Sequence, residues 1–145
     1  MTSCQSPLSH MKKMPMASNR EITDCIESIA PLHYQEEWDN SGYQLGDPSE
    51  RCTGVMVCVD ATEDIVSEAA AKGCNLIIAH HPLMFRGVKQ ILGRNRVERV
   101  IAHALRLGVT IYSCHTSIDN APNGVSWSMA NMLGAHPVKI LSPSH

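Results

Sequence analysis

The sequence has few aromatic and few charged residues, and it lacks the patterns that mark several common classes of protein. Of the 145 residues, 4% are aromatic and 18% are charged, and the net charge is only −2. Without a basic surplus there is no electrostatic field to hold nucleic acid, so direct nucleic-acid binding is not expected. No apolar run approaches the roughly 18 residues that span a bilayer, and the N-terminus has no apolar core like that of a signal peptide. These absences predict a soluble, cytoplasmic protein with no membrane partner.

The six cysteines lack any CxxC pair and any spacing typical of a small disulfide-bonded protein. Cys58, Cys74 and Cys114 lie in or beside strand-like segments, where a free thiol behaves as a small buried hydrophobe. This usage is typical of a reducing compartment.

The N-terminal 20 residues contain no aspartate or glutamate. Residues 1–18 are therefore expected to be a disordered leader, with translation from Met14 or Met16 as an alternative. A mitochondrial presequence has a similar composition, but this one has few arginines and little amphipathic patterning. The remaining residues, 19–145, are enough for one domain and too few for two ordinary ones.

Apolar runs and helical patterns alternate along this domain. Buried strands are predicted at 53–60, 75–80 and 109–115, with shorter strands at 43–45 and 137–141. Helices are predicted at 19–30, 62–73, 95–108 and 125–134, and a polar loop at 116–124. In the helix at 95–108, the residues expected to face the core are Val97, Ile101, Ala104 and Leu105. The alternation indicates an α/β fold with a largely parallel sheet, covered by helices on both faces.

Polar side chains follow three of the predicted strands at the point where each strand ends. Asp60 follows the first strand, His80 and His81 follow the second, and His115 follows the third, with Asp119 in the next loop. Ligands bind outside the carboxyl ends of the strands in an open parallel sheet. Imidazole and carboxylate favour zinc, iron or manganese.

Adjacent side chains on an extended backbone point apart, so His80 and His81 are not expected to chelate one ion together. They could each hold one of two ions about 3.5 to 4 Å apart, with Asp119 supplying negative charge. The alternative for any one residue is structural, because a histidine can hydrogen-bond a carbonyl and an aspartate can cap a helix.

Four segments together resemble a known family in their order and spacing. They are "EWDNSGYQLGDP", "VCVDAT", "IIAHHPLMF" and "SCHTSIDNAPNGVSWSMANMLG". Over residues 22–141 the chain resembles the dinuclear-metal proteins called NGG-interacting-factor-three-like, or GTP cyclohydrolase type 2 homologues. The resemblance implies a three-layer α/β/α fold with a parallel or mixed sheet, of which this chain is the N-terminal half, and assembly into hexamers with two divalent ions per subunit.

The resemblance also implies roles for individual residues. His80 and His81 would each ligate a different ion, and Asp119 would join the ion held by His81. His115 would line the same pocket, as a ligand or as the proton carrier of catalysis. Asp60 would orient a histidine from outside the coordination sphere.

The family completes its site with a histidine and a glutamate four residues later, from a second half that is absent here. His33 and Glu37 have this spacing but precede "WDN", and we interpret them as a coincidence. The domain at 19–145 is therefore expected to be truncated relative to the family.

We predict a homo-oligomeric, metal-dependent hydrolase acting on a nucleotide-like substrate such as GTP. The alternatives are a non-catalytic metal-binding assembly, a transcription-related interaction protein, or an inactive half-chain.

Overall fold

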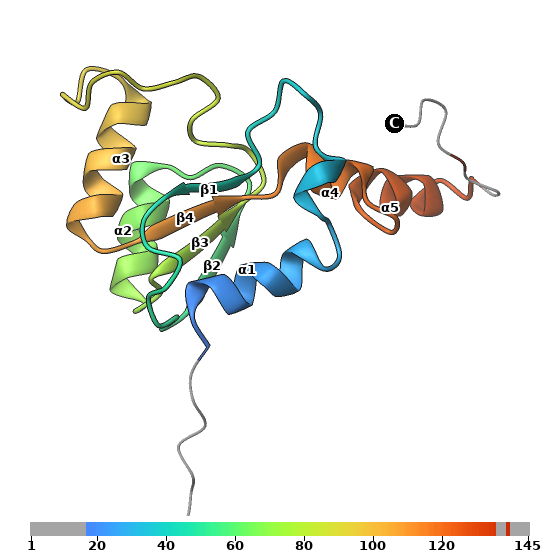
Figure 1. Cartoon of the computed structure of the whole chain (residues 1–145), viewed down its shortest axis with the longest axis horizontal. Coiled ribbons are helices and arrows are strands. Elements are labelled where there is room, and N and C mark those ends of the chain that lie inside the picture. Colours follow the sequence, from blue (N-terminus) through green and yellow to red (C-terminus); the bar gives the residue numbers. More distant parts are fainter. Residues whose placement is uncertain (1–16, 136–138, 140–145) are drawn as a thin grey trace, which may run out of the picture.

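The computed structural model describes residues 17–135 and Lys139 (Figure 1). The strands are β1 (Gly42–Leu45), β2 (Val55–Cys58), β3 (Leu76–Ala79) and β4 (Thr110–Ser113). The helices are α1 (Asn19–Glu27), the short 3₁₀ turn η1 (Leu32–Tyr34), α2 (Glu63–Ala71), α3 (Arg96–Arg106), α4 (His115–Asn120) and α5 (Val125–Met132). The leader expected at 1–18 and the strand expected at 137–141 lie almost entirely outside the described residues.

The four strands form one mixed sheet in the order β1-β4-β3-β2. Strand β3 pairs in parallel with both β2 and β4, and β1 pairs antiparallel with β4. Ala79 at the end of β3 is in register with Cys58 on one side and Ser113 on the other. The three parallel strands therefore end at the same edge of the sheet.

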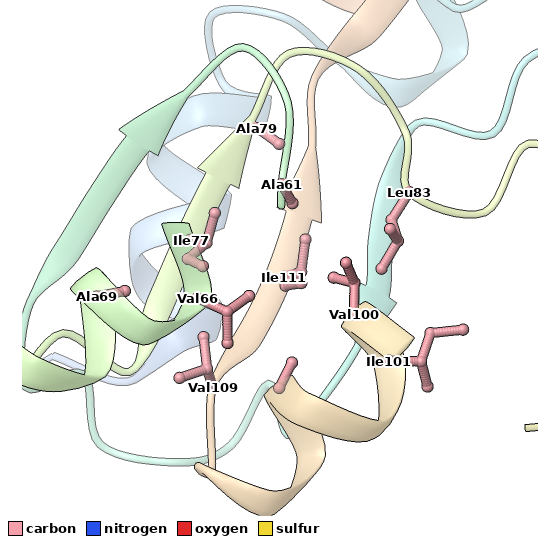
Figure 2. Packing of buried hydrophobic residues seen from close by; sticks show 11 residues of the cluster. Ala61, Val66, Ala69, Ile77, Ala79, Leu83, Val100, Ile101, Val109 and Ile111 are labelled. Atoms are coloured by element: carbon pink, nitrogen blue, oxygen red, sulfur yellow. The ribbon is translucent and has the colours of Figure 1, made fainter. Parts of the chain in front are cut away.

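Helices cover both faces of this sheet, which confirms the predicted three-layer α/β arrangement. Residues alternate along β3, so that Ile77 and Ala79 pack toward α2 and α3, whereas Leu76 and Ile78 belong to the core on the α1 side. Figure 2 shows the first core, in which Val66, Val100 and Ile111 are completely buried. The second core contains Ile22 and Ile26 of α1.

The helix boundaries follow from local sequence. Ser18 caps α1 and forms a reciprocal capping box with Glu21. The Thr62 side chain accepts from the backbone N–H of Ile65 and caps α2, as the sequence predicts. After α2 and α3 the chain turns at Gly73 and Gly108, whose φ angles of 74° and 64° favour glycine.

Three local predictions are wrong. Strand β2 is not buried on both faces but is an edge strand, with Val57 75% exposed, because α1 packs over β3 and β4. Leu105 does not face the core and is 54% exposed, since the buried stripe of α3 runs through Val100, Ile101 and Ala104. The loop predicted at 116–124 is largely replaced by α4.

Among the described residues, no helix combines the length and the apolar character needed to cross a membrane.

Substitution of Ile111 by alanine should lower the free energy of unfolding by about 2 to 5 kcal/mol, because it leaves a cavity in the central core. Val57→Ala on the exposed edge strand is the matched control and should change the free energy by less than about 1 kcal/mol. Urea denaturation followed by circular dichroism measures both values, and equal losses would contradict the assignment of the core.

Candidate functional site

Three histidine rings gather at the carboxyl edge of the parallel strands. The ring centroids of His80 and His81 are 4.9 Å apart. His115 lies 5.6 Å from the ring of His80 and 5.8 Å from that of His81. The two segments that carry these rings are more than 30 residues apart in sequence, so the fold alone brings them together. We call these three residues the histidine cluster.

Backbone hydrogen bonds position the cluster by extending the sheet beyond its strands. The N–H of His80 donates to Cys58 O at 3.0 Å, and the N–H of His81 donates to Val59 O at 2.9 Å. The N–H of His115 donates to His80 O at 2.9 Å, and this carbonyl also accepts from Ser113 Oγ at 2.8 Å. The three Cα positions are therefore fixed by the same pairing that builds the sheet.

Asp60, for which the family resemblance implies a role in orienting a histidine, lies beside His81. His81 Nδ1 is 3.1 Å from Asp60 Oδ1. A carboxylate accepts hydrogen bonds, so this contact places the imidazole proton on Nδ1 and directs Nε2 away from the aspartate. Both side chains are about half exposed.

Asp119 lies on α4, on the side of the cluster nearest His80. Its Oδ1 is 3.9 Å from His80 Nε2, which is an electrostatic contact and too long for a hydrogen bond. Each of the two side chains is about one-third exposed. Asp119 has no ion pair with His81 in the part of the chain that the structure describes.

Asp39 contacts the histidine cluster, although it is not among the site residues predicted from the sequence. Its side chain is fully buried, and it accepts from His115 Nδ1 at 2.8 Å and from the Thr116 N–H at 3.1 Å. It also accepts from the Thr116 hydroxyl, from the Asn40 N–H and from Ser41 Oγ. Burial alone would raise the pKa of Asp39, but these hydrogen bonds outweigh it and lower the pKa to about 2. Asp39 is therefore ionised at neutral pH and lies directly behind His115.

The segment around Asp39 carries part of the family resemblance, but its local pattern is that of a turn and does not indicate a partner for this carboxylate. Asp39 lies in a stretch rich in polar and turn-forming residues, 76 positions before His115. A buried carboxylate next to a predicted site histidine would have been the signal, but burial is a property of the folded chain.

Two histidines of the cluster are each paired with a carboxylate. His81 pairs with Asp60, and His115 pairs with Asp39. In metal sites such pairs fix the ring orientation and increase the basicity of the other nitrogen. The donor types at this edge therefore suit a divalent metal. Within residues 17–135 and Lys139, however, no group of three or more histidine, cysteine, aspartate or glutamate side chains is arranged to hold an ion. The described residues therefore supply donor atoms of types that bind metals, but no three of them are arranged around one point; we call this the open donor set.

The chain is similar to a known protein family and to several of its relatives. The model of the family described as Duf34/NIF3 (NGG1p interacting factor 3) matches residues 17–144. A Clostridium acetobutylicum protein named "GTP cyclohydrolase 1 type 2 homolog" is 30% identical over 126 residues, which are 87% of this chain and 47% of that protein. A Lactococcus lactis protein of the same name is 36% identical over 115 residues, 79% of this chain and 45% of that one.

A solved structure has the same fold. The Bacillus cereus protein related to NIF3 superposes with a TM-score of 0.82 and 34% sequence identity, covering 90% of this chain and 36% of that one. The chain thus spans about half the length, or less, of the relatives that it matches. These matches confirm the resemblance inferred from the four sequence segments.

Replacement of Asp39 by asparagine should destabilise the protein by about 2 kcal/mol at neutral pH, because the donors of His115 and Thr116 lose their charged acceptor. The effect should depend on pH. The pKa of the carboxyl rises from about 2 when folded to an ordinary value of 3.8 when unfolded, so its stabilisation is complete above pH 4 or so and is lost as the pH falls to about 2.

Urea denaturation of both proteins in metal-free buffer between pH 2 and 7 measures this difference. Glu37→Gln, two residues earlier and exposed, is the control and should have little effect at any pH. An Asp39→Asn difference that stays constant down to pH 2 would contradict the assigned charge.

Proposed function

Because the chain belongs to the Duf34/NIF3 family, we propose that it binds divalent metal ions and supports metal-dependent hydrolysis of a nucleotide-like substrate. The observation that carries the proposal is the histidine cluster at the carboxyl edge of three parallel strands, with a carboxylate behind two of its rings. The substrate class rests on analogy with relatives named GTP cyclohydrolase 1 type 2 homolog.

His80, His81 and Asp119 are the proposed ligands, with His80 and His81 on separate ions. Neutral imidazole and carboxylate suit zinc, iron or manganese. A metal bound here would supply a water of lowered pKa as the nucleophile. Further ligands would come from outside the described residues, because the donor set within them is open.

His115 is the proposed proton carrier. Its Nδ1 donates to Asp39, which leaves Nε2 as the nitrogen that can take up and release a proton. The pKa of Asp39 is lowered to about 2, so the carboxylate stays charged at neutral pH and holds the ring of His115 in one orientation. Thr116 holds the carboxylate from its other oxygen and fixes its orientation.

A second candidate is a non-catalytic metal-binding protein that acts as an assembly or interaction partner. The description of the matching family, NGG1p interacting factor 3, favours it, because that description refers to an interaction and not to a reaction. In both versions we propose a homo-oligomer in the cytoplasm. The five described cysteines are all free, which supports a reducing compartment.

Metal analysis of purified protein should find divalent ions, up to two per chain, and His81→Ala should lose about one of them, because it removes one ligand from one ion. His103→Ala is the matched control: this histidine lies on α3, where Ser67 contacts it, and its loss should leave the metal content unchanged. Elemental analysis after dialysis against each metal gives the stoichiometry.

Turnover of GTP then separates the two candidates. Hydrolysis that is lost in both His81→Ala and His115→Ala, with metal retained in His115→Ala, supports the enzyme with His115 as proton carrier. Bound metal without hydrolysis supports the non-catalytic protein. Wild-type protein that binds none of the three metals would overturn the proposal.

A further inference from the structure

Two aromatic rings remain exposed beside the histidine cluster. Trp38 is 60% exposed and Phe85 is 50% exposed, although the chain has only six aromatic residues. Their ring centroids are 5.8 Å apart, and His115 meets both edge-on, at 6.1 Å from Trp38 and 6.0 Å from Phe85. We call Trp38 and Phe85 the aromatic wall. Burial of an aromatic ring is favourable because it removes apolar surface from water. An exposed pair of rings beside a polar site is therefore suited to bind a ligand that stacks on it.

The backbone on either side of the aromatic wall is held in place. Asp39, next to Trp38, is anchored on His115. Asn40 Nδ2 donates to Met84 O at 2.6 Å, which joins the loop of Trp38 to the loop of Phe85. Gln44 donates to Asn40 O at 2.7 Å and accepts from the Met84 N–H at 3.0 Å. The two rings are thus preorganised, which lowers the entropic cost of binding a ligand.

A hollow of about 720 Å³ has Phe85 of the aromatic wall in its lining, whereas Trp38 lies outside the lining. It begins at Pro82, directly after His81, includes Phe85, and has Arg86, Lys89 and Arg96 along its sides. This volume is within the range of small-molecule sites. Its one carboxylate, Glu98, accepts from the backbone N–H groups of Leu92 and Arg94. The hollow therefore has an excess of positive charge next to an aromatic surface.

We propose that the aromatic wall stacks against the planar heteroaromatic ring of a ligand, while the cationic side chains of the hollow bind an anionic group of the same molecule. The inference rests on the proposed function and narrows it to ligands with both parts, such as a nucleoside phosphate. Stacking on an aromatic side chain tolerates any base, so the wall selects a ring rather than one nucleobase. Arginine pairs well with phosphate oxygens. Trp38 and Phe85 are binding residues in this scheme and leave the proton chemistry to His115.

The proposal is tested by fluorescence titration of the full-length Trp127→Phe variant, in which Trp38 is the sole tryptophan and therefore the source of the tryptophan signal. The titrants are GTP, guanosine and tripolyphosphate, in EDTA so that bound metal makes no contribution. GTP should bind more tightly than either part alone. GTP and guanosine should quench the fluorescence of Trp38, whereas tripolyphosphate should not.

Calorimetry should show that the affinity for GTP is about tenfold lower in Trp38→Ala and is largely retained in Trp38→Phe, which keeps an aromatic face. Phe85→Ala should also weaken GTP, and Arg86→Ala should weaken GTP and tripolyphosphate but not guanosine.

Unchanged GTP affinity in both Trp38→Ala and Phe85→Ala would overturn the inference, as would no binding of GTP to the wild type. Trp38 emission that shifts with protein concentration, with no response to nucleotide, would also overturn it and assign the wall to a protein interface. Metal content is measured on the same variants and should not change in Trp38→Ala. Metal binding without nucleotide binding would therefore remove this inference and leave the non-catalytic metal-binding candidate, whereas nucleotide binding without metal would remove the proposed metal site and leave this inference in place.

Discussion

The parallel pairing of β3 with its two neighbours is the constraint on which the site depends. It aligns the ends of β2, β3 and β4 and then continues past them, through the N–H groups of His80, His81 and His115. Each of these histidines is therefore held by a sheet hydrogen bond from its own backbone. A change of register by one residue would exchange the faces of the sheet and separate the rings.

Asp39 holds the loop before β1 against the histidine cluster. This residue belongs to the loop before β1, yet its buried carboxylate joins His115 and the first turn of α4. The next residue, Asn40, donates a hydrogen bond to the backbone carbonyl of Met84 and so holds the loop that follows His81. One short polar stretch thus fixes His115, the backbone beside the exposed tryptophan and the loop of Phe85. The low pKa of Asp39 is a consequence of the same hydrogen bonds.

The chain matches the Duf34/NIF3 family over residues 17–144 and spans about half or less of the relatives' length. The described residues bring together imidazoles and a carboxylate, but no group of three that could hold an ion. The carboxylates of Asp60 and Asp39 hold the rings of His81 and His115 in their orientations through contacts within the protein.

Much of the fold was determined by the sequence itself. Apolar runs and caps predict the strands, the helices at 62–73 and 95–108 and the three-layer arrangement, because these features depend on local periodicity and local hydrogen bonds. The same runs place His80, His81 and His115 at strand ends, which is why a common site could be expected. The exposed edge of β2 and the exposure of Leu105 could not be predicted, since strand order and helix rotation are set by packing.

Only the tertiary structure decided how the site is supported. Asp39 pairs with His115 across 76 residues, and Trp38 meets Phe85 across 47, in stretches where nothing local indicates a partner. Helix α4, in a segment that reads as a polar loop, carries Asp119 to the side of His80. The physical reason is the same in each case. Side-chain chemistry and periodicity are local properties of the chain, whereas burial and contact between distant loops arise only when the sheet brings them together.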